Sequence, residues 1–377
     1  MDLNFEGVTA IYGRPGVGKT SLAMRIAHEH VKRGQRVLWV SLYEDKDTFV
    51  KNATALGYDL SGVDFWDMIF VKTDVMINQI VSTVSQEDYG LVVVDSLSSM
   101  LEGVQSREYL INAVYRVFKP SKTNLVAVAE EESVTPLDYV ADNLLRLEMR
   151  LSNGVTERRM YVVKSRGRRG GYYIEFDIVE GMGVVFIDEL PRPPPKPSWE
   201  AWAESLSGAF GPIRGGNFYI LLGKALTPLL ARAAAELSQQ RLKVLYRTLS
   251  RDASTVSKLV EKYGGKVEVQ QASPKPQSYF THVKSLYDAL ANSSADVVIS
   301  DRVDVEFLLY GRKAFEINLY EIRELKNLGV ALFIGCEKSW GLRHLADYMA
   351  VLKGEEALVY APHGKTVCKA EETKIRC

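Results

Sequence analysis

A glycine-rich string near the N-terminus restricts the fold of this chain more than any other feature. Residues 13–20 fit the pattern G-x-x-x-x-G-K-[ST] in full. A short apolar run over 8–12 precedes the string, and residues 20–32 follow it with the apolar spacing of a helix. Such a loop wraps backbone N–H groups around a polyanion, and its glycines allow the dihedral angles required. The string therefore predicts a strand, a phosphate-binding loop and a helix, in that order.

The residue types in the loop predict a nucleoside triphosphate, ATP with Mg²⁺, as its ligand. We expect Lys19 to reach the β- and γ-phosphates and the Thr20 hydroxyl to bind Mg²⁺, next to the positive end of a helix dipole. The alternative is a glycine-rich turn with an unrelated lysine. The expected nucleotide-binding residues are Gly13, Arg14, Pro15, Gly16, Val17, Gly18, Lys19, Thr20 and Ser21.

An acidic residue, Asp95, follows the continuous apolar run 91–94. At the carboxyl edge of a parallel sheet it would face the phosphate loop and hold Mg²⁺ through a water. It would otherwise cap the next helix. We favour the metal role because Asp301 stands at the matching place in the second half of the chain.

Strands alternate with helices in the first half, which is typical of βαβ units and a parallel sheet covered on both faces. From about residue 144 strands follow one another without helices, which predicts an antiparallel extension. The expected fold class is α/β, each domain a mainly parallel sheet flanked by helices with an antiparallel C-terminal extension. The expected strands are 8–12, 37–42, 91–94, 125–129, 144–151, 159–164, 172–178 and 183–187, and the expected helices are 20–32 and 48–56.

The second half repeats the first at a nearly constant shift of about 207 residues, which predicts a tandem duplication. The expected domains are 1–190 and 208–377, joined by a proline-rich linker over 191–207, where prolines favour an extended spacer. The repeated pairs are 37–39 with 244–246, 93–95 with 299–301, 127–130 with 333–337, and 141–142 with 346–347.

Composition and charge give no sign of several classes of function. The 47 basic and 47 acidic residues give no net charge, so nothing global indicates a nucleic-acid or membrane partner. No apolar run approaches the ~18 residues that cross a bilayer, and the acidic N-terminus does not resemble a signal peptide. Cys336, Cys368 and Cys377 have no metal-ligand spacing, so reduced thiols and a cytoplasmic protein are expected.

Residues 7–187 resemble the KaiC branch of the RecA-like ATPases. The resemblance depends on the phosphate loop, on N-A-x-x-L-G-x-D-L over 52–60, on the strand ending at Asp95, and on K-x-R-G over 164–167. It implies two tandem RecA-like P-loop domains and hexameric rings that hold ATP between neighbouring subunits. In that family the K-x-R pair, here Lys164 and Arg166, projects onto the nucleotide of the next subunit, where cations stabilise charge on the γ-phosphate. A solvated basic hairpin and a nucleic-acid contact are the other interpretations of this pair.

One departure from the family concerns the catalytic acid. The family has two adjacent acids after the second strand, and the first orients the attacking water. Here Tyr43 takes the first position and Glu44 remains. Because neighbouring side chains on a strand point to opposite faces, Glu44 reaches the water only if the strand ends or bulges there. Slow hydrolysis and a binding-only switch therefore both remain open.

The second half lacks the residues of the loop. At the shift of about 207, Leu226 stands in place of the lysine, Ala225 in place of the glycine and Arg251 in place of Glu44. A displaced lysine, Lys224, would be an alternative phosphate ligand, whereas the K-x-R pair maps near Ala361 and His363. This half is expected to serve assembly or to respond to the nucleotide state of the first.

Together these features predict an ATP- and ADP-binding protein that is a slow ATPase or nucleotide-driven switch acting as a ring of identical subunits. The alternatives are a RecA-like DNA-binding ATPase, for which nucleic acid is a less favoured partner, and a non-hydrolysing assembly module. The expected catalytic residues are Glu44, Lys164 and Arg166, and the expected metal ligands are Thr20 and Asp95.

Overall fold

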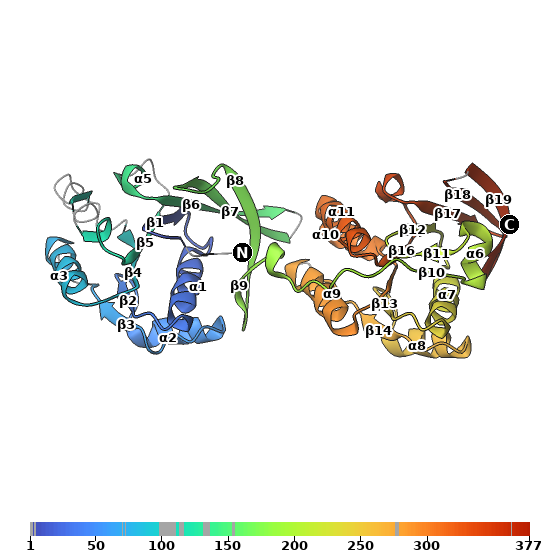
Figure 1. The fold of residues 1–377 in the computed structure, drawn as a ribbon, viewed down its shortest axis with the longest axis horizontal. Helices are drawn as coiled ribbons and strands as arrows, with labels where there is room; N and C mark the ends of the chain where they lie inside the picture. Colours follow the sequence, from blue (N-terminus) through green and yellow to red (C-terminus); the bar gives the residue numbers. More distant parts are fainter. Residues whose placement is uncertain are drawn as a thin grey trace. The chain divides into compact units, whose positions relative to one another are not determined.

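The chain divides between Glu189 and Leu190 into two compact units (Figure 1). The computed structural model describes residues 3, 5–69, 71, 73–97, 111–112, 117–130, 136–152, 155–275, 279–362 and 364–377. Within these residues no helix is both long and apolar enough to cross a membrane.

The first unit is built on a nine-stranded sheet with the strand order β3-β2-β4-β5-β1-β6-β7-β8-β9. The strands from β3 to β6 pair in parallel, and the pairs β7–β8 and β8–β9 are antiparallel. The strands are β1 (Val8–Gly13), β2 (Val37–Ser41), β3 (Asp64–Asp67), β4 (Leu91–Asp95), β5 (Asn124–Glu130), β6 (Asn143–Ser152), β7 (Val155–Ser165), β8 (Tyr172–Val179) and β9 (Gly183–Phe186).

Helices cover both faces of this sheet (Figure 1). Alternate residues of each strand point to opposite faces, so Trp39 packs with α1 and α2, whereas Leu38 and Val40 pack with α3. Apolar cores therefore form on both sides, and the carboxyl ends of the parallel strands meet along one edge. The helical segments are α1 (Lys19–Lys32), α2 (Lys46–Ala55), α3 (Thr73–Gln86), α5 (Pro136–Val140) and the 3₁₀ turn η3 (Ile187–Glu189).

The second unit repeats this order strand for strand as β14-β13-β15-β16-β12-β17-β18-β19-β20. Its strands are β12 (Phe218–Leu222), β13 (Val244–Thr248), β14 (Glu268–Gln271), β15 (Val297–Asp301), β16 (Ala331–Cys336), β17 (Tyr348–Lys353), β18 (Glu356–Ala361), β19 (Gly364–Glu371) and β20 (Lys374–Arg376). Its helical segments are α6 (Glu204–Phe210), α7 (Thr227–Gln239), α8 (Ala253–Lys262), α9 (Tyr279–Ser293), α10 (Asp304–Tyr310), α11 (Arg312–Asn327) and the turn η4 (Leu342–His344).

A carboxylate occupies the same place in each unit, immediately before the last parallel strand. Asp142 accepts the backbone N–H of Val8 at 3.0 Å, and Asp347 accepts that of Phe218 at 2.7 Å. Each carboxylate also binds a lysine, Lys119 in the first unit and Lys326 in the second. The two units therefore share a fold and also the contact that joins the central strand to its neighbour.

The second unit buries charged side chains on the face of its sheet that packs against α9, α10 and α11. Arg247 of β13 is 1% exposed and approaches the carboxylate of Glu306, which accepts a hydrogen bond from His282 at 2.7 Å. Burial raises the pKa of the neighbouring Glu321 to about 8, with Arg247 opposing the rise and Glu306 adding to it. At the position matching Arg247 the first unit has Val40, in an apolar core.

The proline-rich segment after residue 190 packs within the second unit. The backbone N–H of Lys196 donates to the carbonyl of Leu328 at 2.7 Å, and its ammonium lies 3.0 Å from Asp296. The segment 191–207, expected as a linker, also carries the two-residue strand β10 (Glu200–Ala201), which pairs with β11 (Ile213–Arg214), and the start of α6.

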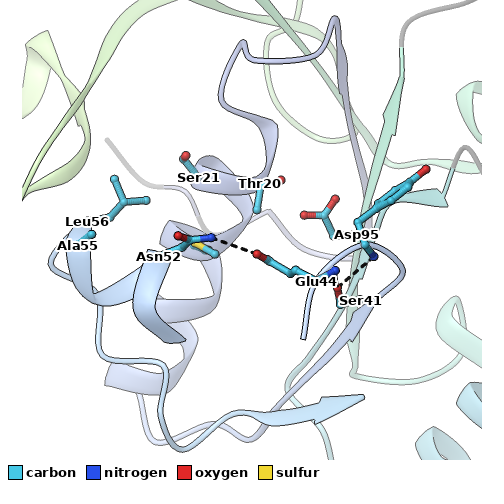
Figure 2. Close-up of a pocket in the computed structure, with 10 residues that line it drawn as sticks. Thr20, Ser21, Ser41, Glu44, Asn52, Ala55, Leu56 and Asp95 are labelled. Atoms are coloured by element: carbon cyan, nitrogen blue, oxygen red, sulfur yellow. Dashed lines mark hydrogen bonds between the residues drawn. The ribbon is translucent and has the colours of Figure 1, made fainter. Parts of the chain in front are cut away.

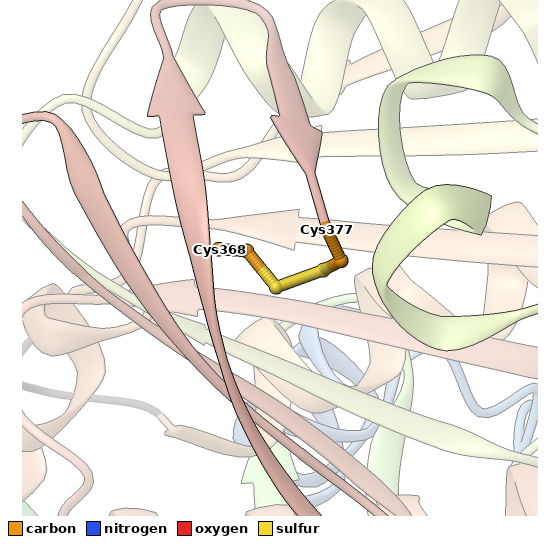
Figure 3. Close-up of a disulfide and its surroundings, with 2 residues drawn as sticks. All are labelled: Cys368 and Cys377. Carbon is orange, nitrogen blue, oxygen red and sulfur yellow. A yellow bond between two sulfur atoms is a disulfide. The ribbon is translucent and has the colours of Figure 1, made fainter.

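A disulfide joins Cys368 of β19 to Cys377, and Cys336 is a buried free thiol (Figure 3). The expectation of reduced thiols is therefore wrong for two of the three cysteines. The β19–β20 hairpin brings their Cα atoms to 4.4 Å, and this proximity arises from strand pairing that cysteine spacing alone does not reveal.

Candidate nucleotide-binding site

The phosphate loop connects β1 to α1, and a side chain on either of two of its glycines would press on neighbouring atoms. A Cβ on Gly13 would lie 2.4 Å from the carbonyl oxygen of Leu147, and one on Gly18 would lie 2.5 Å from Cδ1 of Ile178. Gly18 also has φ 107 and caps the start of α1, a conformation that favours glycine. The shape of the loop thus depends on contacts with β6 and β8.

Lys19 is buried, and its ammonium turns back toward the first residues of the loop. The Lys19 ammonium donates to the carbonyl oxygens of Gly13 at 2.7 Å and Arg14 at 3.2 Å. It also forms an ion pair of 3.0 Å with Glu130, the last residue of β5. Lys19 is 7% exposed, so this cation is held by three oxygens that a phosphate group would replace.

Thr20 and Asp95 meet beside the loop, as the sequence predicts. The Thr20 side chain, at the start of α1, is hydrogen-bonded to the carboxylate of Asp95, which ends β4. Burial raises the pKa of Asp95, whereas this hydrogen bond and the charge of Lys19 lower it. A hydroxyl and a buried carboxylate form a hard-oxygen donor set, which suits Mg²⁺.

A pocket of about 590 Å³ opens at this carboxyl edge of the sheet (Figure 2). Residues from α1, β2, α2, β4 and the turn after β2 line it, and several are polar. The lining residues are Thr20, Ser21, Met24, Ser41, Tyr43, Glu44, Asn52, Ala55, Leu56 and Asp95.

Glu44 points into this pocket because β2 ends at Ser41. The Ser41 hydroxyl accepts the backbone N–H groups of Tyr43 and Glu44 at 3.4 and 3.1 Å, and so turns the chain. Asn52 of α2 donates to the Glu44 carboxylate at 3.1 Å (Figure 2). Burial raises the pKa of Glu44, and Asn52 lowers it. Because the strand has ended before Glu44, the alternation of side chains along a strand does not keep Glu44 out of the pocket. The side chain of Tyr43 is 66% exposed.

Lys164 and Arg166 lie at the opposite edge of the sheet from the phosphate loop. The Lys164 ammonium donates to the carbonyl of Asp138 at 3.1 Å, and the backbone N–H of Arg166 donates to that of Asp142 at 2.9 Å. Asp142 immediately precedes β6, which runs parallel to β1, so both cations lie near the amino ends of these strands. The structure therefore separates them from the other predicted site residues of the same chain.

The second unit keeps a threonine–aspartate pair but closes it off. The Thr227 hydroxyl, at the start of α7, donates to Asp301 at 2.7 Å, and the Tyr246 hydroxyl donates to the same oxygen at 3.0 Å. Asp301 is 0% exposed, and Leu226, in the place of Lys19, is 1% exposed. The threonine–aspartate pair of the second unit is thus buried, although a pocket of about 950 Å³ lies over the neighbouring loop, next to Glu337.

An arginine from another element contacts the loop of the second unit. The Arg302 guanidinium donates to the carbonyl of Lys224 at 3.2 Å and to Glu337 at 2.8 Å. Glu337 corresponds to Glu130, so Arg302 joins carboxylate and loop as Lys19 does in the first unit. The side chain of Lys224 is exposed, and Ala361 ends β18, the counterpart of β7. His363, near which the K-x-R pair maps, lies outside the described residues.

Three residues around the site were not predicted from the sequence. Asn52 is part of the string that carries the family resemblance, and its contact with Glu44 joins α2 to the turn after β2. Glu130 and Asp142 both stand in segments that recur in the second half. The repetition was the only signal for these two, and it gives no indication of what each carboxylate binds.

Residues 4–190 match the family model described as "ATPase: KaiC". The circadian clock protein KaiC2 of Synechocystis sp. is 27% identical over 197 residues, which cover 47% of this chain and 35% of KaiC2. The DNA repair protein RadA of Campylobacter jejuni is 31% identical over 90 residues, which cover 24% of this chain and 19% of RadA. The DNA repair and recombination protein RadB of Methanococcoides burtonii is 23% identical over 198 residues, which cover 45% of this chain and 85% of RadB.

The chain thus spans about a third of the length of KaiC2 and a fifth of that RadA. The matched residues, 4–190, contain the phosphate loop, Asp95 and the K-x-R-G string. Residues 4–190 therefore form a domain of the KaiC ATPase family, consistent with a KaiC-like, RecA-like P-loop ATPase.

Proposed function

We propose that this protein is a slow ATPase or nucleotide-driven switch that binds ATP with Mg²⁺ in its first unit and acts as a ring of identical subunits. The convergence of Thr20, Asp95 and Glu44 on one pocket beside Lys19 carries this proposal. Phosphate would replace the carbonyl and carboxylate contacts of Lys19, and Thr20 and Asp95 would hold Mg²⁺. The bound cation would neutralise charge between the β- and γ-phosphates.

Glu44 is the residue we assign to the attacking water. Its carboxylate lies in the pocket with Asp95, and the amide of Asn52 fixes its orientation. A carboxylate whose pKa is raised by burial is a better proton acceptor than an exposed one. Tyr43, which is mostly exposed, has no part in this step, so hydrolysis does not require an acid at its position.

Lys164 and Arg166 are assigned to the nucleotide of a neighbouring subunit. They lie at the edge of the sheet opposite the phosphate loop, so in one subunit they cannot reach the nucleotide bound there. In a ring, one subunit's carboxyl edge would meet the next subunit's amino edge. An arginine supplied from a neighbour in this way can raise turnover by orders of magnitude.

Mixing two impaired variants tests the arrangement between subunits. Lys19→Ala should abolish nucleotide binding, and Arg166→Ala should lower turnover with little change in ATP affinity. After subunit exchange the mixture should recover activity, because some interfaces then pair an intact loop with an intact Arg166. A mixture no more active than its parents, with exchange demonstrated by labelled subunits, would exclude the arrangement between subunits.

A second candidate function is DNA binding by the basic hairpin that follows β7. Arg166, Arg168 and Arg169 are exposed there, and the similar proteins include RadA and RadB. Binding of single-stranded DNA that weakens steeply with salt, and that Arg168→Ala with Arg169→Ala removes, would favour this function. Unchanged ATPase activity in the presence of DNA, without measurable binding, would favour the first proposal.

A further inference from the structure

The carboxylate of Asp142 contacts three elements at the amino edge of the first sheet. Its Oδ2 accepts the backbone N–H of Val8 at 3.0 Å. Its Oδ1 binds the ammonium of Lys119 and lies 3.2 Å from a guanidinium nitrogen of Arg166. The backbone of Arg166 also donates to the carbonyl of Asp142. Asp142 is 8% exposed, so its carboxylate is held in place while the side chain of Arg166 extends into solvent.

Asp347, the counterpart of Asp142 in the second unit, shares its contacts with the central strand and a lysine but, in the described part of the chain, not its contact with an arginine. Both aspartates accept the first amide of the central strand and bind a lysine, so both hold the sheet together. Among the described residues Asp347 has Lys326 as its ion-pair partner and no arginine. The contact with Arg166 is therefore an addition in the unit that carries the phosphate loop.

Arg166 keeps most of its hydrogen-bonding capacity. Its side chain is 64% exposed while one guanidinium nitrogen faces Asp142. A guanidinium has five N–H donors in a planar fork, so the contact with Asp142 leaves a free edge for a second anion. Although burial acts to raise it, the hydrogen bonds from Lys119 and Val8 keep the pKa of Asp142 below its usual value.

We propose that Asp142 is a positioning residue that holds Arg166 extended at the amino edge, ready for the triphosphate of a neighbouring subunit. The inference deepens the proposed function and rests on it. A long side chain loses conformational entropy when it binds a ligand. Because the contact with Asp142 already restricts the Arg166 side chain, part of this entropy is lost before the subunits associate. Asp142 thus acts through Arg166 and does not touch the nucleotide.

The matched variants are Asp142→Asn and Asp347→Asn in the 377-residue chain. Asparagine keeps an oxygen for the strand amide and removes the charge that binds the lysine, so both variants should lower thermal stability to a similar degree. Only Asp142→Asn loses the hold on Arg166. We expect its kcat to fall roughly 5- to 20-fold, less than for a buried charge-assisted contact because the Arg166 side chain is 64% exposed, with ATP affinity of the unassembled subunit unchanged. Asp347→Asn should keep the wild-type kcat.

A double variant and a second measurement exclude a merely structural effect. Asp142→Asn combined with Arg166→Ala should be no slower than Arg166→Ala alone, because the aspartate then has nothing to position. The concentration of ATP that drives assembly, read by analytical ultracentrifugation, should rise in Asp142→Asn and Arg166→Ala and stay unchanged in Asp347→Asn. This second measurement applies even where turnover is slow.

The outcomes separate the inference from the function on which it rests. Arg166→Ala with a clear defect, beside Asp142→Asn that behaves as Asp347→Asn, would overturn the positioning role and leave the proposed function intact. An additive double variant would overturn the positioning role as well. Wild-type protein that neither hydrolyses ATP nor assembles with it would overturn the proposed function and this inference together.

Discussion

The ammonium of Lys19 and the carboxylate of Glu130 form a 3.0 Å ion pair across the mouth of the phosphate loop. Glu130 ends β5, and Lys19 begins α1. The contact means that an incoming phosphate competes with a carboxylate of the protein for the same cation. Glu130 thereby links nucleotide binding to the end of a central strand.

Glu130→Gln should therefore bind ATP more tightly than the wild-type protein. Removing the competing negative charge while keeping the side-chain shape should lower the Kd about tenfold, corresponding to roughly 1.4 kcal/mol. Isothermal titration calorimetry measures this directly. Affinity equal to or weaker than wild type would mean that Glu130 supports the site and does not compete for Lys19.

The wild-type chain of 377 residues should bind one nucleotide, and Lys19→Ala should bind none. Lys19 makes charge-assisted contacts, each worth about 1.5–3 kcal/mol, and in the second unit a buried leucine, Leu226, stands in place of this lysine. Calorimetric stoichiometry distinguishes the possibilities. Residual binding in Lys19→Ala that Lys224→Ala then removes would show that the exposed lysine of the second unit binds phosphate.

Glu44→Gln should lower kcat by about 10²- to 10³-fold, in the range typical of a general base, with little change in ATP affinity. Tyr43→Phe is the matched control on the neighbouring, exposed position and should leave kcat unchanged. Because burial raises the pKa of Glu44, kcat should increase with pH over a range above the ordinary titration of glutamate. A larger defect in Tyr43→Phe than in Glu44→Gln would reverse the assignment.

The stability of the second unit should fall as pH rises from about 5 to 8. Burial raises the pKa of Glu321 in the folded protein to about 8, so the folded state holds a proton that the unfolded state has lost. The slope for one such proton approaches about 1.4 kcal/mol per pH unit. Glu321→Gln should flatten the decline, measured by urea unfolding at several pH values. An unchanged slope would show that Glu321 is ionised in the folded protein.

Cys377→Ser should lower the melting temperature of the second unit, and reductant should have the same effect on the wild-type protein. The disulfide closes a nine-residue separation between β19 and the end of β20, and a loop of that size accounts for about 2–3 kcal/mol in the chain-entropy model. Reductant should not alter Cys377→Ser further. Identical melting with and without reductant in the wild-type protein would show that the bond contributes nothing to stability.

The strands with continuous apolar runs were predictable from the sequence, because burial on both faces leaves a local pattern. The expected strands over 91–94 and 125–129 are confirmed as β4 and β5, and the α/β class and the antiparallel extension are confirmed with them. The edge strand β3 was not predicted. Its four residues, Asp64–Asp67, pair on one side only, through β2, and their partly exposed pattern gives no comparable signal.

The candidate site also has features that the sequence predicts and contacts that it does not. The phosphate loop is contiguous, so its sequence is sufficient to recognise it, and the structure brings Thr20 and Asp95 together as expected. The contact of Asn52 with Glu44 and that of Glu130 with Lys19 join residues from different elements. Such contacts depend on where β2 ends and on which strand lies beside β1, and neither is encoded in a local pattern.

Arg302 restricts the conformations of the loop in the second unit more than Lys19 restricts those of the loop in the first unit. Lys19 in the first unit can exchange Glu130 for phosphate, whereas Arg302 extends from β15 to the Lys224 carbonyl and Glu337. The neighbouring Asp301 is already hydrogen-bonded by Thr227 and Tyr246. We therefore expect the loop of the second unit to keep one arrangement, whereas the loop of the first unit alternates between an ion-paired and a phosphate-bound one.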